Sequence, residues 1–266
     1  MPHVRANDLD IGYDVIGDGP PMVLLHAATS VGRETYAAQI PTLAARFRVY
    51  LPDARGHGRT RWDVADGFEA GWLVDDLAAL VDALDLDRFH LVGYSMGGMT
   101  ALGVAVRAPE RLRSLVALGI ATAREPRASV ARRLMDPARI LRDDPGWAAE
   151  LARLHDPVQG TGAWQRLLPA VADDVARQPL LGPADLRRIS PPTLVACGDR
   201  DPLVPVAQAA ELARQVRDGR LLVVPAGGHD ILSQQPALVA EAMTGFHRAI
   251  ERGAEPSAVS PSEGRP

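Results

Sequence analysis

The chain of 266 residues contains no lysine, so its 29 basic Lys and Arg positions are all arginine. This absence excludes mechanisms that need a lysine amine, among them phosphate binding by a P-loop lysine, Schiff-base formation and a serine–lysine dyad. The single cysteine, Cys197, excludes an internal disulfide and any metal cluster built from several cysteines. Serine, histidine and carboxylate side chains are therefore the main candidates for chemistry.

The chain also has little net charge and no clear membrane segment. Its formal charge of −4 gives no indication of nucleic-acid or anionic-membrane binding. The first ten residues carry charges where a signal peptide needs an apolar stretch. The longest run without a charged residue, 89–106, has three glycines and a serine at its centre, which predicts a buried strand, turn and helix. We therefore expect a cytoplasmic protein that binds neither nucleic acid nor membranes.

Short apolar runs alternate with helical patterns along most of the chain. In 72–86, for example, leucine and valine recur at the spacing of one helix face. Runs suited to buried strands lie at 22–25, 48–51, 89–92, 115–118, 193–196 and 221–224. Helical patterns also lie at 97–108, 205–216 and 234–250. The alternation predicts an α/β fold with a mostly parallel, doubly wound sheet covered on both faces, and 3–16 predicts an antiparallel hairpin at its edge.

One segment breaks this alternation. Residues 122–188 contain no convincing strand but have apolar residues at helical spacing. We therefore predict a core formed by 1–121 and 189–252, with a helical insertion at 122–188. The last stretch, 253–266, has little that could be buried and is predicted to be a disordered tail.

A Gly-Tyr-Ser-Met-Gly motif at 93–97 lies between a predicted strand and a predicted helix. That setting is typical of a nucleophile elbow, in which flanking glycines permit a sharp turn that projects the Ser95 hydroxyl above the sheet. The N-terminus of the following helix supplies backbone N–H groups and a favourable dipole for an oxyanion. The alternative is a glycine-rich turn with an incidental serine, and the strand–helix context favours the elbow.

A serine hydroxyl needs a base, and the base needs an acid to orient it. His229 follows the last predicted strand, and the carboxyl ends of parallel strands converge on one crevice, so this side chain is expected to reach Ser95. The loop after 193–196 offers two carboxylates, of which Asp201 is the predicted acid and Asp199 the reserve. His26 and His57 are expected to shape loops instead of acting as bases.

These motifs resemble the α/β-hydrolase superfamily over about residues 10–250. The resemblance is carried by Leu24-Leu25-His26-Ala27-Ala28, the Asp53–Gly58 segment, Gly93-Tyr94-Ser95-Met96-Gly97-Gly98 and the Asp201/His229 pair. It implies that the insertion is a helical cap over the pocket. It also implies that the backbone N–H groups of Ala28 and Met96 form the oxyanion hole. Ala27 stands where the family usually has glycine, so the choice between Ala27 and Ala28 as donor stays open.

The resemblance is to small bacterial serine esterases, enol-lactonases and cofactor-free haloperoxidase-like proteins. It implies hydrolysis of a small carboxylic ester or lactone through an acyl-enzyme, with Ser95, His229 and Asp201 as the catalytic residues and no metal or organic cofactor. Two alternatives remain at this point. One is a C–C bond hydrolase, lyase or cyclase that uses the same three residues, and the other is a non-catalytic ligand-binding protein.

The insertion offers residues for substrate recognition, but their spacing suits two roles equally. Large apolar side chains either line a pocket or pack helix against helix, and these are Leu134, Trp147, Leu151, Trp164 and Leu167. Four arginines are able to recognise an anionic group, although a solvated helix face is the expected role, and these are Arg124, Arg127, Arg132 and Arg133.

Overall fold

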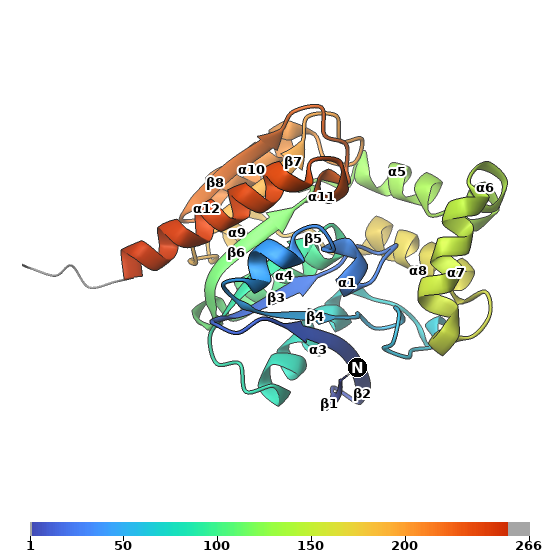
Figure 1. Cartoon of the computed structure of the whole chain (residues 1–266). Coiled ribbons are helices and arrows are strands. Elements are labelled where there is room, and N and C mark those ends of the chain that lie inside the picture. The colour runs from blue at the N-terminus through green and yellow to red at the C-terminus, as the bar shows by residue number, and fades with distance from the viewer. Residues whose placement is uncertain (1, 255–266) are drawn as a thin grey trace, which may run out of the picture.

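An eight-stranded sheet forms the centre of the protein in the computed structural model, which describes residues 2–254 (Figure 1). The strands are β1 (His3–Ala6), β2 (Leu9–Ile16), β3 (Pro21–Leu25), β4 (Arg48–Pro52), β5 (Phe89–Tyr94), β6 (Leu112–Leu118), β7 (Thr193–Gly198) and β8 (Gly219–Val224). Their spatial order is β1-β2-β4-β3-β5-β6-β7-β8. The strands β1 and β2 form an antiparallel hairpin, β2 is antiparallel to β4, and all later pairs are parallel.

Helices connect the strands and cover the sheet. Before β6 these are α1 (Gly32–Thr35), α2 (Ile40–Ala44), α3 (Ala70–Ala83) and α4 (Met96–Arg107). Between β6 and β7 lie α5 (Arg127–Leu134), α6 (Pro137–Asp143), α7 (Pro145–Gln159), α8 (Ala163–Arg177) and α9 (Pro183–Leu186). The last helices are α10 (Val206–Gln215), α11 (Ile231–Gln234) and α12 (Pro236–Ala254). No helix within residues 2–254 is long and apolar enough to cross a membrane.

The alternation of side chains along each strand creates two apolar layers, one on each face of the sheet. In β5, Leu91 belongs to the apolar layer that includes α3, α4 and α10, whereas the neighbouring Val92 belongs to the layer that includes α2 and α12. Both side chains are completely buried. A strand that is buried on both faces reads as a continuous apolar run, which explains why the central strands were recognisable in the sequence.

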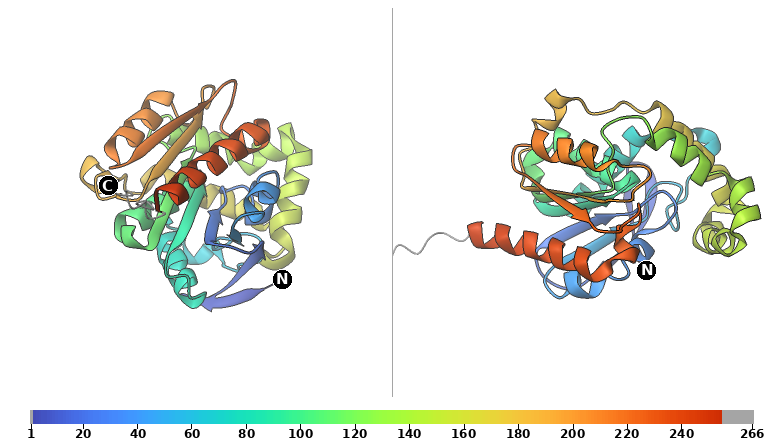
Figure 2. Two further views of the ribbon diagram at one scale, coloured as in Figure 1. Left: turned by 60° about the vertical axis from the view of Figure 1, so that its left-hand side comes forward. Right: turned by 90° about the horizontal axis from the view of Figure 1, so that it is seen from above.

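The insertion between β6 and β7 is held together by its own small core. Asp136 and Asp144 cap the N-termini of α6 and α7 with their side chains, and a proline follows each of them at the first helical position. Trp164 and Leu151 are at most 2% exposed in this core. The helices α5 to α8 lie at one end of the molecule, away from the C-terminal end of α12 (Figures 1 and 2).

The structure confirms the predicted mostly parallel sheet, its antiparallel edge hairpin and the helical insertion between two strands. One detail is wrong, because the run at 221–224 is not covered on both faces: β8 is the edge strand, and Leu221 is 41% exposed. The helix α12 runs to Ala254, beyond the predicted start of the tail at 253. The rest of that predicted tail lies outside the described residues.

Candidate active site

Ser95 lies at the sharp turn between β5 and α4, where the sequence predicts it. Its backbone has φ 53° and ψ −111°, a conformation that is strained for a residue with a side chain. The turn needs small neighbours because a Cβ on Gly93 would lie 2.2 Å from the carbonyl oxygen of Gly97, and one on Gly97 would lie 2.4 Å from that of Leu25. The spacing of these two glycines is therefore a steric requirement of the turn.

The structure brings Ser95, His229 and Asp201 together from three separate strand ends. The Ser95 hydroxyl donates to Nε2 of His229, with 2.9 Å between oxygen and nitrogen. The opposite ring nitrogen, Nδ1, donates to Oδ2 of Asp201 over 2.8 Å. Gly119 at the end of β6 makes room for this ring, since a Cβ there would lie 2.9 Å from Cε1 of His229. The chain of hydrogen bonds has the geometry of a nucleophile, a base and an orienting acid.

Asp201 is fixed by its own loop. Its Oδ1 accepts the backbone N–H groups of Leu203 and Val204 at 2.8 and 3.1 Å, which leaves Oδ2 for His229. The Asp201 side chain is completely buried. The reserve candidate, Asp199, instead lies 3.8 Å from the guanidinium of Arg200 and is 37% exposed, so the geometry favours Asp201.

Two backbone N–H groups near Ser95 are candidates for the oxyanion hole. Met96 begins α4. Ala28 lines the same cavity as Ser95, whereas Ala27 packs into the apolar layer that includes α2 and α12. Among residues 2–254, no acceptor binds the N–H of Met96 or of Ala28. The N–H of Gly97 donates to the carbonyl oxygen of His26 over 3.0 Å and ties the two segments together. The arrangement favours Ala28 over Ala27 as the second candidate donor.

His26 and His57 support the loop that carries Ala28, as predicted. Nδ1 of His26 donates to the carbonyl of Ala27, and its Nε2 accepts from the N–H of Ala54, both over 2.8 Å. The His57 ring lies against the carbonyl oxygen of Ala28. Burial lowers the pKa of His26 and holds that of His57 well below its usual value. Burial therefore disfavours the protonated form of both rings.

Cys197 is buried near the end of β7. Burial, aided by the negative charges of Asp201 and Asp199, raises the pKa of its thiol to about 11. Because the thiolate is the nucleophilic form, Cys197 is a poor candidate for covalent chemistry at neutral pH.

A cavity opens above Ser95 and His229, roofed by the insertion. Most of its walls are apolar, with Phe68, Met99, Met135, Val171 and Leu203 among them. Trp147, Leu151, Trp164 and Leu167 do not line this cavity, and apart from the half-buried Trp147 they are buried in helix packing, while Leu134 is exposed. The apolar residues singled out in the sequence therefore serve the architecture of the insertion.

Arg127 and Asp174 also line this cavity. The sequence offered Arg127 only as one of four arginines able to recognise an anion, and it did not identify Asp174. The prediction of a solvated helix face is wrong for Arg127, which is 7% exposed. Asp174 is 7% exposed as well. Asp174 carries no local signal in the sequence, because the packing of α8 decides whether this residue reaches the cavity wall.

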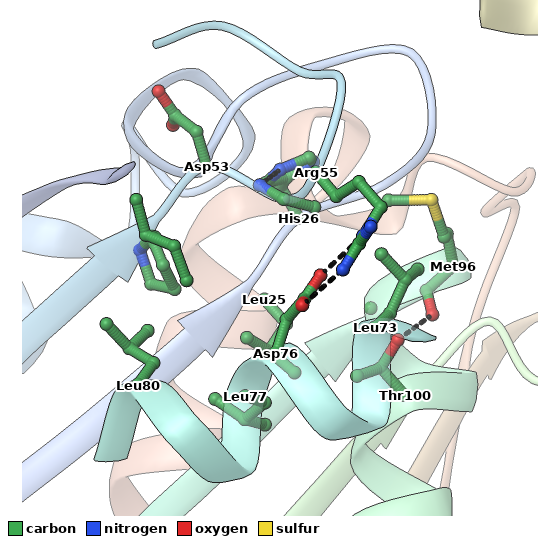
Figure 3. Close-up of a pocket in the computed structure, with 14 residues that line it drawn as sticks. Leu25, His26, Asp53, Arg55, Leu73, Asp76, Leu77, Leu80, Met96 and Thr100 are labelled. Carbon is green, nitrogen blue, oxygen red and sulfur yellow. Dashed lines mark hydrogen bonds and ion pairs between the residues drawn. The ribbon is translucent and has the colours of Figure 1, made fainter. Parts of the chain in front are cut away.

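Met96 also borders a second cavity, whose lining residues are drawn in Figure 3. Its polar centre is an ion pair in which Nε and Nη2 of Arg55 donate to both oxygens of Asp76 over 2.8 and 2.6 Å. Asp76 comes from α3, and Arg55 lies in the loop after β4. Met96 and Gly97 border this cavity too, so the ion pair and the turn at Ser95 share one cavity.

Comparison with known proteins places this geometry in a family. The model of the alpha/beta hydrolase family matches residues 22–242. RutD of Caulobacter sp. (strain K31), a suggested carbamate hydrolase, is 30% identical over 265 residues, with 91% of this chain and 98% of the relative covered.

Two solved structures extend the comparison. Est816, described as an N-acyl homoserine lactone degrading enzyme, is 30% identical with a TM-score of 0.74 and covers 92% of this chain and 100% of its own. The enol-lactonase from Burkholderia xenovorans LB400 shares the fold at 21% identity, with a TM-score of 0.75 and coverage of 93% and 100%. The chain therefore belongs to the alpha/beta hydrolase family of enzymes.

Proposed function

We propose that this protein is a serine hydrolase that cleaves a carboxylic ester or lactone through an acyl-enzyme. The observation that carries the proposal is the continuous hydrogen-bond chain from Ser95 through His229 to Asp201, with Ser95 on a strained turn. The suggested carbamate hydrolysis of one relative and the lactone degradation of another, each 30% identical, support a reaction at an acyl carbon.

In the first half of the reaction, Oγ of Ser95 attacks the carbonyl carbon while Nε2 of His229 takes the hydroxyl proton. The negative charge that develops on the carbonyl oxygen is stabilised by the N–H groups of Met96 and Ala28. Asp201 holds the Nδ1 proton and stabilises the imidazolium. The tetrahedral intermediate then collapses, and the departing alcohol oxygen receives the proton from His229.

In the second half, His229 removes a proton from a water molecule that attacks the acyl group on Ser95. A second tetrahedral intermediate forms in the same oxyanion hole and breaks its bond to Oγ, which recovers its proton from His229. The product is a carboxylic acid, and for a lactone the alcohol group stays attached to it.

The test is chemical labelling combined with turnover. A fluorophosphonate is expected to add one phosphonyl group to Ser95, detected by peptide mass spectrometry, and short p-nitrophenyl esters are expected to be hydrolysed. Ser95→Ala is expected to lose labelling and to reduce kcat by at least about 10⁴-fold, because the nucleophile is absent. The matched control is Ser233→Ala, which removes a hydroxyl from α11.

Three results would contradict the proposal in different ways. Unlabelled, folded protein would indicate a binding function. Labelling without ester or lactone hydrolysis, but with cleavage of a β-diketone, would indicate a C–C bond hydrolase. Ester hydrolysis that survives Ser95→Ala would place the chemistry elsewhere on the protein.

A further inference from the structure

Two buried side chains of opposite charge face the cavity above Ser95. Arg127 is the first residue of α5 and Asp174 lies in the last turn of α8, and each residue is 7% exposed. The helices α5 and α8 pack against each other within the insertion. Both charges therefore come from the part of the chain that covers the site, and not from the strand ends that carry the nucleophile and the base.

Neither charge neutralises the other by direct contact. Within residues 2–254, the guanidinium of Arg127 makes one hydrogen bond, from Nη2 to the carbonyl of Val175 at 3.4 Å, and its Nε has no acceptor. One carboxylate oxygen of Asp174 accepts the N–H of Ala70 over 3.2 Å. Burial lowers the pKa of Arg127 and raises that of Asp174, so both charged forms are poorly solvated. A ligand that supplies the missing hydrogen bonds would relieve this cost.

The signs of the two charges select the kind of ligand. An anion in the cavity is attracted by Arg127 but repelled by Asp174. A cation is attracted by Asp174 but repelled by Arg127. A neutral group that has both a carbonyl oxygen and an N–H can form a hydrogen bond with each side chain. Its oxygen accepts from Arg127 and its N–H donates to Asp174. The side-chain amide of Gln178, which lines the same cavity, offers the same complementarity. The remaining walls are apolar and suit a hydrocarbon chain.

We propose that Arg127 and Asp174 form a subsite for an uncharged amide-type group, so that the preferred substrate is an ester or lactone which also carries an amide, carbamate or urea. This inference rests on the proposed function and deepens it. The two residues act in binding, while Ser95 and His229 carry out the chemistry.

The first experiment compares esters that differ only in this group. One pair places the amide on the acyl side, as 4-nitrophenyl 4-acetamidobutanoate against 4-nitrophenyl heptanoate. A second pair places it on the alcohol side, as 2-acetamidoethyl acetate against pentyl acetate. In at least one pair kcat/KM is expected to favour the amide by about 10- to 100-fold, the value of one or two hydrogen bonds to charged groups. The monoester 4-nitrophenyl hydrogen adipate tests a carboxylate at the same distance.

Variants then locate the preference. Arg127→Met and Asp174→Asn preserve side-chain size and are each expected to reduce the amide preference by about tenfold. Their matched controls are Arg132→Met on α5 and Asp173→Asn on α8, two exposed neighbours of the same residue types, which are expected to leave the preference unchanged. The preference is a ratio of two rates on one protein sample, so partial loss of folded protein does not alter it.

A binding measurement separates this inference from the proposed function. N-propylacetamide is expected to bind unreactive Ser95→Ala, detected by ligand-observed NMR, and to bind more weakly when Arg127→Met is added. Equal rates within both ester pairs, or amide binding that ignores both variants, would overturn the inference while leaving the serine hydrolase intact. A preference for the adipate monoester would also overturn the inference if Asp174→Asn strengthens that preference, because the subsite would then bind anions. Failure of Ser95 labelling would instead contradict the proposed function.

Discussion

Asp201 and His229 lie 2.8 Å apart through Oδ2 and Nδ1, and the second oxygen of Asp201 is occupied by the backbone N–H groups of Leu203 and Val204. The carboxylate therefore cannot rotate without breaking two hydrogen bonds. The loop after β7 thus fixes both the position of the His229 ring and the nitrogen that carries its proton, which leaves Nε2 free to accept from Ser95.

Asp201→Asn is expected to lower kcat by about 10³- to 10⁴-fold, because an amide N–H facing Nδ1 favours the wrong imidazole tautomer. The variant keeps the size of the side chain, so thermal unfolding should change little. Steady-state kinetics on a p-nitrophenyl ester measure the effect, and Asp199→Asn is the matched control, with kcat expected to stay near that of the parent protein. A larger loss for Asp199→Asn than for Asp201→Asn would show that the acid has been assigned to the wrong carboxylate.

The strand ends that carry Ser95, Asp201 and His229 were predictable because each depends on local sequence. A buried parallel strand needs a continuous apolar run, and the loop that follows such a run lies at the carboxyl edge of the sheet. The same reasoning failed for 221–224, because an apolar run does not reveal whether a strand is central or at the edge. Leu221 is apolar and exposed, which a single sequence cannot distinguish from a buried leucine.

The cavity walls were far less predictable than the strand ends. Arg127 begins a helix rich in arginine, and such a pattern is typical of a solvated face, yet the N-terminal turn of α5 faces α8 and the cavity. Asp174 is one of two adjacent aspartates, and only the rotation of α8 about its axis decides which is buried. Helix rotation depends on packing between elements far apart in the chain, which periodicity alone does not specify.

Gly97→Ala is expected to destabilise the protein by more than about 2 kcal/mol and to lower activity strongly, because the new Cβ would lie 2.4 Å from the carbonyl oxygen of Leu25. Relief of this clash requires α4 to move away from β3, which displaces the N–H of Met96. Chemical denaturation measures the stability, and kinetics measure the activity.

The matched control is Gly245→Ala in α12, where a Cβ would meet nothing within 4 Å. That substitution is expected to stabilise the protein by about 0.5–1 kcal/mol, since alanine is the better helix former and restricts the unfolded chain. A fully stable and fully active Gly97→Ala protein would contradict the close approach of β3 and α4.

His247 is expected to make the protein less stable as the pH falls. Its ring is completely buried beside Phe47, Nδ1 donates to the carbonyl of Met243 over 2.7 Å, and burial lowers the pKa to about 4 from its ordinary 6.5. Above pH 6.5 both the folded and the unfolded chain hold a neutral ring. Below that, the unfolded chain takes up a proton which the folded chain refuses until about pH 4, so stability decreases with pH.

His247→Phe removes this proton uptake. The loss in free energy of unfolding between pH 7.5 and pH 5 is therefore expected to shrink by about 2 kcal/mol, whatever the substitution costs at neutral pH. Urea unfolding at the two pH values measures the difference, and the exposed His3→Phe is the control with no expected change. An unaltered pH dependence in His247→Phe would mean that the buried ring is already able to accept a proton in the folded protein.

The ion pair between Arg55 and Asp76 lies in the cavity that Met96 borders, and both of its side chains are at most 8% exposed (Figure 3). Asp76→Ala is expected to cost about 3–5 kcal/mol, because it leaves the Arg55 guanidinium buried without its carboxylate. The neighbouring Asp75 on α3 pairs with Arg107 at the surface, so Asp75→Ala is the control and is expected to cost less than about 1 kcal/mol. Urea midpoints at an unchanged denaturant slope measure both values. The double variant Arg55→Met with Asp76→Leu removes both charges and is expected to be more stable than Asp76→Ala alone. A double variant that is less stable than Asp76→Ala would show that the buried charges themselves stabilise the protein.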